Sequence, residues 1–233
     1  VINDTYIKAE AINRRMGSAM EAIVAEGCNG RMYIAPNVEM QKALVVNSPK
    51  NYPNGALPND TRNFWTVPYG LTHYADLVTP RQLTALTTLS DLVEEVRKKA
   101  ESDAAVAGMA DDHIPLRDGG TGAQAYGEAV AVYLGFVVDK LSDYNSSICS
   151  WNSPGEKMRN TFGRQAIPMV WDYAAANPFS HSSGCFDHML EWVVKCVVEL
   201  PTMLCGEVRQ FDEPTACGWG SLMRSKAPPY YDH

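Results

Sequence analysis

The segment from Gly122 to Tyr144 places the strongest constraint on the fold. Its apolar residues recur at helical spacing and predict one long helix. The residues on one side are Tyr126, Val130, Leu134, Val137, Leu141 and Tyr144, and Val132, Tyr133 and Phe136 lie on the others. A helix that is apolar on almost every side is buried on more than one side. We therefore expect this helix to lie in the interior.

A second helix is predicted to begin after Thr79. Thr79 is the expected N-cap, Pro80 takes the first helical position and Gln82 completes a capping box. An apolar stripe follows, made of Leu83, Leu86, Leu89 or Ser90, Val93 and Val96. Glu94, Glu95, Arg97, Lys98 and Lys99 indicate a solvated end with basic residues near the C-terminus, as the helix dipole favours.

Shorter helices are predicted elsewhere in the chain. The spacing of Ile12, Met16, Ala19, Met20 and Ile23 predicts a helix that stops at Gly27 or Gly30. Prolines at helix-start positions predict two short helices, over 154–164 and 168–176. Ser182 or Ser183 is expected to cap a last helix, which carries Phe186, Leu190, Val193, Val194 and Val197 and halts at Pro201.

Little strand is predicted. Residues 31–35 (RMYIA) can form a strand that ends at Pro36, and the prolines and Asn-Gly of 47–70 indicate a long loop, anchored by Phe64, Trp65 and Tyr69. The expected fold is mainly α, a helical domain with little strand. We expect an initial helix, a short strand and a long loop in 1–78, a helical core in 79–205 and a tail in 206–233.

Composition limits the classes of function. The chain has 233 residues, of which 45% are hydrophobic, so it can bury one sizeable core. A net charge of -7 and a pI near 5.2 argue against gripping nucleic acid through bulk charge, although a local basic patch is compatible with them. No apolar run is long enough to span a bilayer and the first residues lack a signal-peptide layout, so we expect a cytoplasmic protein without a membrane partner.

Cysteine and histidine spacing does not indicate a metal. None of the six cysteines forms a CxxC pair and no HExxH motif occurs, so we expect no bound metal ion. Cys196 lies in an apolar helical run and is expected to be a small buried hydrophobe. A GxSxG elbow for a serine nucleophile is also absent.

The stretch from Asp143 to Gly184 mixes aromatic anchors with many side chains that form hydrogen bonds. Each polar group that is buried needs a partner, so a stretch that only had to fold would not need so many of them. One interpretation is a binding surface, with Asn145, Ser146, Trp151, Arg159, Asn160 and Arg164 as the substrate-binding candidates. The other is a capped, turn-rich connection between helices.

Ordered blocks of sequence resemble a known family. These blocks are YIKAE and RMG within 6–17, AIVAEG at 22–27, TPRQLTALTTLSDLV at 79–93, LRDGGTGAQAY at 116–126, EAVAVYL at 128–134, and DYNSSICSW through RNTFGRQAIPMVWDYAAANPFSHSSG within 143–184. Over roughly four-fifths of its length the chain resembles the central region of the prokaryotic adenine-specific DNA methylases that carry an inserted zinc ribbon and often accompany phage-defence genes.

The resemblance implies methyl transfer from S-adenosylmethionine to the exocyclic amine of adenine in DNA, with the base swung out of the duplex. A D-P-P-Y motif receives that base in the family, and Pro228, Pro229 and Tyr230 match it here. Ala227 stands in place of the Asp, and alanine cannot accept a hydrogen bond from the amine. The family's glycine-rich cofactor loop and zinc-ribbon cysteines are missing from the sequence, which favours the insert and helices between two catalytic halves rather than a complete transferase sheet.

We therefore expect a truncated or split methyltransferase that binds no S-adenosylmethionine alone, is inactive alone and needs a partner polypeptide with the cofactor-binding half. A second hypothesis is a non-catalytic helical module that contacts DNA or protein. A third is a small-molecule enzyme that uses the loop at 119–122 and Asp143. That loop lacks the Lys-Ser/Thr of a P-loop, so a flexible helix start is its default interpretation.

Overall fold

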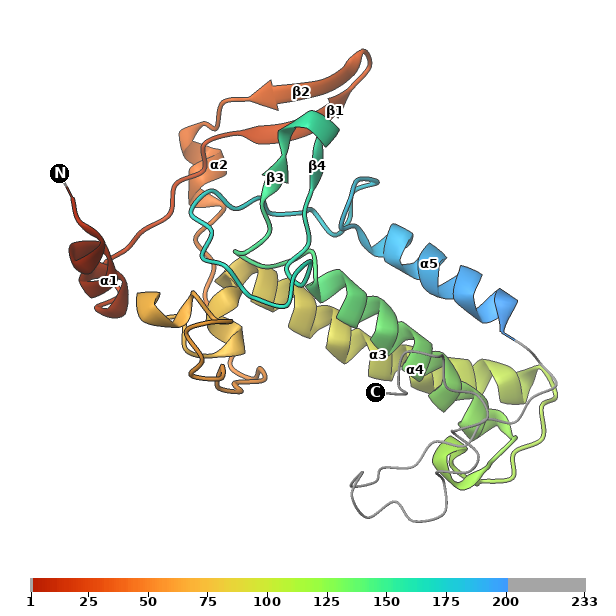
Figure 1. Ribbon diagram of the computed structural model, residues 1–233. Helices are drawn as coiled ribbons and strands as arrows, with labels where there is room; N and C mark the ends of the chain where they lie inside the picture. Colours follow the sequence, from red (N-terminus) through yellow and green to blue (C-terminus); the bar gives the residue numbers. More distant parts are fainter. Residues whose placement is uncertain (1, 201–233) are drawn as a thin grey trace, which may run out of the picture. The chain divides into compact units, whose positions relative to one another are not determined.

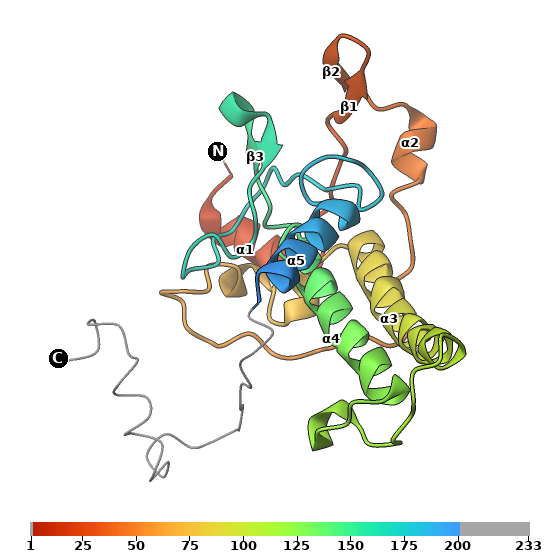
Figure 2. The same cartoon turned by 90° about the vertical axis from the view of Figure 1, so that its right-hand side faces the viewer.

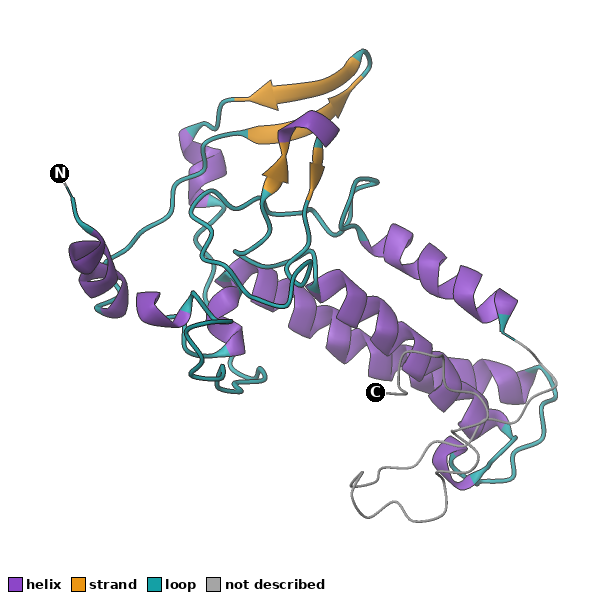
Figure 3. Ribbon diagram, in the orientation of Figure 1, coloured by secondary structure: helices purple, strands orange, loops and turns teal. Residues whose placement is uncertain are grey.

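The architecture of the chain, in a computed structural model that describes residues 2–200, is mainly helical with two small antiparallel sheets (Figures 1 and 3). The elements in order are α1 Asp4–Ile12, β1 Ile23–Gly27, β2 Gly30–Ile34, α2 Val38–Lys42, η1 Val67–Tyr69, η2 Tyr74–Leu77, α3 Pro80–Val106, η3 Leu116–Asp118, α4 Ala123–Ser142, β3 Trp151–Asn152, η4 Ser153–Gly155, β4 Lys157–Met158 and α5 Phe186–Glu199. The predicted class, mainly α with little strand, is confirmed. None of the helices within 2–200 combines the length and the apolar character needed to cross a membrane.

Helices α3 and α4 lie side by side and are the longest elements (Figures 1 and 2). The predicted start of α3 is confirmed: the Thr79 hydroxyl accepts from the Gln82 N–H at 3.3 Å, and the Gln82 side chain accepts from the Thr79 N–H at 3.0 Å. At Gly127 of α4 the two backbones approach closely, because an added Cβ would lie 2.8 Å from the Arg97 carbonyl oxygen. Gly127 therefore sets how near the helices can pack.

Two apolar clusters are associated with this helix pair. Val137 and Leu141 of α4 pack with Met189 of α5, and further residues of α3 and α5 surround them. The second cluster joins the η2 turn before α3 to loop segments, through Leu57, Leu77, Ile148 and Ile167. The predicted apolar side of the 122–144 helix is thus buried at Val137 and Leu141, but Val132 and Phe136 on its other sides are 49% and 56% exposed, so the expectation that this helix lies in the interior is wrong.

The glycine loop before α4 is closed by carboxylates of the chain itself. Asp112 accepts from the Thr121 N–H at 2.9 Å and the Ile114 N–H at 3.1 Å, while Asp111 accepts from the Gln124 N–H at 3.4 Å. The hydrogen bond from the Thr121 backbone is the main reason that the pKa of Asp112 is lowered. An external anion would have to displace these carboxylates, which weakens the hypothesis of a ligand at 119–122.

The predicted helix over 12–27 is wrong. Helix α1 ends at Ile12, Arg14 adopts a left-handed conformation with φ 58°, and Ile23–Gly27 is a strand paired with Gly30–Ile34. The hairpin closes between Gly27 and Gly30, and Gly30 has φ 111°, which favours glycine. The strand predicted over 31–35 is confirmed as β2, and its partner strand overrides the weak helical spacing before it.

The short helices predicted over 154–164 and 168–176 are also wrong. Pro154 lies in the η4 turn that joins β3 to β4, and Glu156 follows it with a left-handed φ of 44°. The segment after it pairs with distant loops: Ile167 exchanges backbone hydrogen bonds with Asn63 and Trp65. Pro154 therefore belongs to a tight turn rather than to the start of a helix.

Two smaller expectations about α5 also need correction. The residue before the helix is Cys185, whose carbonyl accepts from the Met189 N–H, and the Ser182 hydroxyl instead contacts Ser180 at 2.8 Å. Cys196 is exposed, whereas Cys149 and Cys185 are the cysteines that the described structure buries. The apolar stripe predicted for this helix is present, and its Met189 is buried.

Asp76 holds the irregular segment before α3. Burial opposes ionisation of its carboxyl, but hydrogen bonds from the Thr72 and His73 N–H groups and from Arg14 outweigh burial and lower its pKa. A lowered native pKa stabilises the fold above the unfolded-state pKa of about 3.9, and this contribution is lost as the pH falls through the native value.

We expect Asp76→Asn to lower the free energy of unfolding at pH 6, and the difference from the unchanged protein to shrink at pH 3. Urea unfolding at the two pH values measures it. Asp139→Asn, an exposed change on α4, should have little effect at either pH. If Asp76→Asn destabilised the protein equally at pH 6 and pH 3, the stabilising role of the ionised Asp76 carboxylate would be wrong.

Candidate nucleic-acid interface

The segment that follows α4 separates into an inner set and an outer set of polar residues. The inner set, made of Asp143, Asn145, Ser146, Asn160 and Thr161, ties the end of α4 to the chain after β4. The outer set lies on and around the β3–β4 hairpin. The two sets have different chemical roles.

Asp143 organises the inner set. One carboxylate oxygen accepts from the Phe162 N–H and the other from the Asn160 side-chain amide, both at 2.8 Å. Its carbonyl oxygen accepts from the Thr161 N–H at 2.7 Å and from the Thr161 hydroxyl at 2.8 Å. These groups are used internally, so Asp143 is a structural residue rather than the centre of a small-molecule site.

Ser146 and Asn145 are buried beside it, with 3% and 2% of their surface exposed. The Ser146 hydroxyl lies 2.7 Å from the Thr161 hydroxyl and accepts from the Ile148 N–H at 3.0 Å. The Asn145 amide donates to the Leu141 carbonyl at 2.9 Å. This placement differs from the expected substrate-binding surface, because burial keeps both side chains from a ligand. For these two residues and Asn160 the structure favours the capped, turn-rich connection.

The outer set begins with the β3–β4 hairpin. Trp151 pairs with Met158, and Asn152 pairs with Lys157. Because side chains alternate along a strand and paired residues share a face, Trp151 lies on the face of the buried Met158, and Lys157 lies with Asn152 on the other face. The Arg159 guanidinium donates to the side-chain oxygen of Asn152 at 3.3 Å, and Arg159 is exposed. Two cations are therefore presented together.

Two side chains of the β1–β2 hairpin reach the β3–β4 hairpin, although more than a hundred residues separate the two hairpins in the sequence. The Arg31 guanidinium lies 6.0 Å from the centre of the Trp151 ring, and the Tyr33 hydroxyl donates to Glu156 at 3.2 Å. Sequence analysis did not select Arg31 or Tyr33. The sequence signal for them is that Arg31 and Tyr33 alternate with Met32 in a strand, so their side chains lie on one face of that strand.

We call the group of Arg31, Trp151, Lys157 and Arg159 the hairpin surface. Glu26 also approaches it, and its carboxylate accepts from Arg31 at 3.2 Å. A guanidinium beside an indole ring suits phosphate contact and base stacking, and exposed Lys and Arg side chains suit phosphate contacts. Arg31 accompanies Trp151, which shares the face of Met158, whereas Lys157 and Arg159 are presented with Asn152 on the other face of the β3–β4 hairpin.

The remaining candidates lie apart from this group or outside the described range. Arg164 is exposed in the loop after Thr161, where Phe162 also keeps 54% of its surface exposed. Ala227, Pro228, Pro229 and Tyr230 lie outside the described residues 2–200. Within that range no three His, Cys, Asp or Glu side chains come together in a way that could hold a metal ion.

Comparison with known proteins adds no further assignment: no protein-family model, no curated protein and no solved structure matches the chain.

Proposed function

We propose that this chain contacts DNA as part of an S-adenosylmethionine-dependent adenine-specific DNA methyltransferase, and that the hairpin surface makes the contact. The observation that carries the proposal is the meeting of Arg31 with Trp151 across two hairpins that are distant in sequence. The ordered sequence blocks that resemble the methylase family support the enzyme class. Their densest block, within 143–184, contains Trp151 and Arg159.

The chemistry of the hairpin surface suits a nucleic acid better than a small anion. A single anion needs converging donors in a hollow, whereas Lys157 and Arg159 share the face of a two-stranded ribbon. A ribbon of this kind fits the major groove of duplex DNA. With a net charge of -7 on the whole chain, the attraction has to be local, so we expect it to weaken steeply with salt.

In this proposal the chain does not transfer the methyl group by itself. Ala227 cannot accept the hydrogen bond that the family's Asp takes from the adenine amine. A partner polypeptide therefore supplies the cofactor pocket and the missing acceptor. Adding such a polypeptide to the chain should produce methyl transfer to adenine in DNA, measured with radiolabelled S-adenosylmethionine, whereas the chain alone should give none.

DNA binding itself is tested by fluorescence anisotropy of a labelled duplex over a series of salt concentrations. Arg159→Ala should weaken binding severalfold at low salt and reduce the slope of log K against log salt by about 0.9, the contribution of one phosphate contact. Its matched control is Arg117→Ala on η3, where the side chain is 84% exposed and far along the sequence from either hairpin.

Equal losses for Arg159→Ala and Arg117→Ala would contradict the assignment, because they would indicate attraction to bulk charge. Binding that does not depend on salt would also count against it. The chain could bind DNA in a salt-dependent way and still give no methyl transfer after the partner polypeptide is added. DNA binding would then stand without the methyltransferase assignment, and the chain would be a non-catalytic DNA-binding module.

A further inference from the structure

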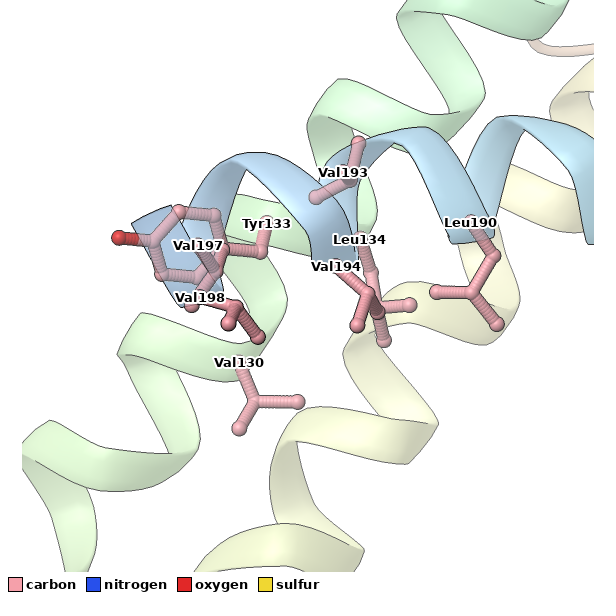
Figure 4. A pocket seen from close by; sticks show the side chains of 8 residues that line it. All are labelled: Val130, Tyr133, Leu134, Leu190, Val193, Val194, Val197 and Val198. Atoms are coloured by element: carbon pink, nitrogen blue, oxygen red, sulfur yellow. The ribbon is translucent and has the colours of Figure 1, made fainter. Parts of the chain in front are cut away.

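Two surface features are left without a role by the DNA contact. One is an apolar groove that aliphatic side chains of α4 and α5 line together with the Tyr133 ring (Figure 4). Nothing in the described part of the chain shows what covers this groove, and it carries no inference. The other is the turn at the tip of the β3–β4 hairpin, where Glu156 has a left-handed backbone.

The conformation of Glu156 is unfavourable for a glutamate. The residue ends the η4 turn with φ 44° and ψ 46°, in the left-handed region. A residue with a Cβ is strained there, whereas glycine adopts this region freely. The adjacent Gly155 has no positive φ, so the glycine of this turn lies one position before the residue that would benefit from it. The turn alone would be more stable with glycine at position 156.

The charge of Glu156 is also unfavourable for a DNA contact. Lys157 and Arg159 follow it closely in the sequence and are exposed, and its carboxylate would repel the phosphates that these cations attract. Strained residues persist where the surrounding contacts hold them, and they cluster at functional sites. A strained and repulsive side chain at this turn therefore indicates a role that outweighs both effects.

The hydrogen bond of Glu156 identifies that role. Its carboxylate accepts from the Tyr33 hydroxyl of β2 at 3.2 Å. Arg31 lies on the same face of β2, and its guanidinium is 6.0 Å from the centre of the Trp151 ring. Two side chains of one strand therefore reach two points of the β3–β4 hairpin. A single contact would let the hairpins turn about it, whereas the second contact restricts that motion.

We propose that Glu156 is a positioning residue for DNA binding, which holds the β1–β2 hairpin through Tyr33 and so keeps Arg31 beside Trp151 before DNA arrives. The inference rests on the DNA contact proposed for the hairpin surface. A larger fraction of the free protein then has the arrangement that binds, and this lowers the apparent Kd.

The test measures the affinity of the full chain for a fluorescent duplex at low salt. Tyr33→Phe removes only the hydroxyl, and we expect it to weaken binding about two- to tenfold, the range for loss of one hydrogen bond. Glu156→Ala should also weaken binding, although removal of a negative charge alone would strengthen attraction to phosphate. The matched control is Tyr126→Phe on α4, where the tyrosine is 48% exposed, and it should leave binding unchanged.

A second variant at the same position separates positioning from a general effect on stability. Glu156→Gly removes the carboxylate as Glu156→Ala does, but it also relieves the left-handed backbone. We expect the glycine variant to unfold about 2–4 °C above the alanine variant in a thermal melt followed by circular dichroism. The two variants should nevertheless bind DNA equally weakly. A merely structural role would instead make binding rise and fall with stability.

The outcomes distinguish failure of this inference from failure of the DNA contact. If the unchanged protein bound the duplex and Tyr33→Phe bound it equally well, the positioning role alone would be overturned. If Tyr33→Phe weakened binding further in a chain that already carries Glu156→Ala, the two residues would act separately, which also contradicts the proposal. If the unchanged protein bound no duplex, the DNA contact would fail and the positioning role with it.

Discussion

Gly127→Ala is expected to lower the free energy of unfolding by about 1–3 kcal/mol, the usual cost of overpacking a tight contact. The new Cβ would lie 2.8 Å from the Arg97 carbonyl oxygen and 3.1 Å from the Glu101 backbone nitrogen of α3. Both atoms belong to the backbone of a long helix, so α3 and α4 would have to move apart to admit the methyl group. Urea denaturation followed by circular dichroism measures the change.

The same helix supplies a control of opposite sign. Gly135 of α4 is exposed, and an added Cβ would meet no atom within 4 Å. Gly135→Ala should therefore raise the free energy of unfolding by about 0.5–1 kcal/mol, because alanine loses less conformational entropy in a helix. If both substitutions changed stability in the same direction, the close approach of α3 and α4 at Gly127 would be wrong.

The second large effect is expected at two buried threonines that differ in their hydrogen bonding. Thr161 donates to the Asp143 carbonyl and lies 2.7 Å from the Ser146 hydroxyl, whereas the Thr66 hydroxyl has no hydrogen-bond partner in the described part of the chain. Valine has nearly the same shape as threonine. Thr161→Val should cost about 2 kcal/mol, because it removes the hydroxyl that bonds to both the Ser146 hydroxyl and the Asp143 carbonyl in the interior.

Thr66→Val should have the opposite effect and stabilise the protein by about 1 kcal/mol, since it removes a buried hydroxyl that is not satisfied. Thermal unfolding of the two variants beside the unchanged protein makes the comparison. Destabilisation by Thr66→Val as large as that by Thr161→Val would mean that Thr66 has a partner, and would contradict the described environment of its side chain.

The helices with strong local signals were predictable from the sequence, and the elements that depend on distant partners were not. The capping box of Thr79 and Gln82 and the apolar period of 122–144 are local, and both helices form where expected. The 12–27 segment has some helical spacing, but Ile23–Gly27 pairs with β2 and becomes a strand. Tertiary and cross-strand contacts override weak propensity in such segments.

The polar residues of the 143–164 segment show the same limit. Sequence composition shows that Asn145, Ser146, Arg159 and Asn160 can all form hydrogen bonds, but not whether the partner is internal. The fold buries Asn145 and Ser146 beside Thr161 and leaves Arg159 exposed. Arg31 comes to the hairpin surface only through folding, because its neighbour Trp151 is 120 positions away in the sequence.

The closed base of the β3–β4 hairpin has a consequence for engineering and for divergence. The Thr161 N–H bonds to the Asp143 carbonyl and the Arg159 N–H bonds to the Ser150 carbonyl, so the ends of the excursion are fastened by residues outside the ribbon. The entropy of closing a loop changes slowly with its length. The β3–β4 hairpin can therefore be replaced by another hairpin while the backbone hydrogen bonds at its base stay unchanged. New residues at its tip can alter what the protein recognises without any change to the helices.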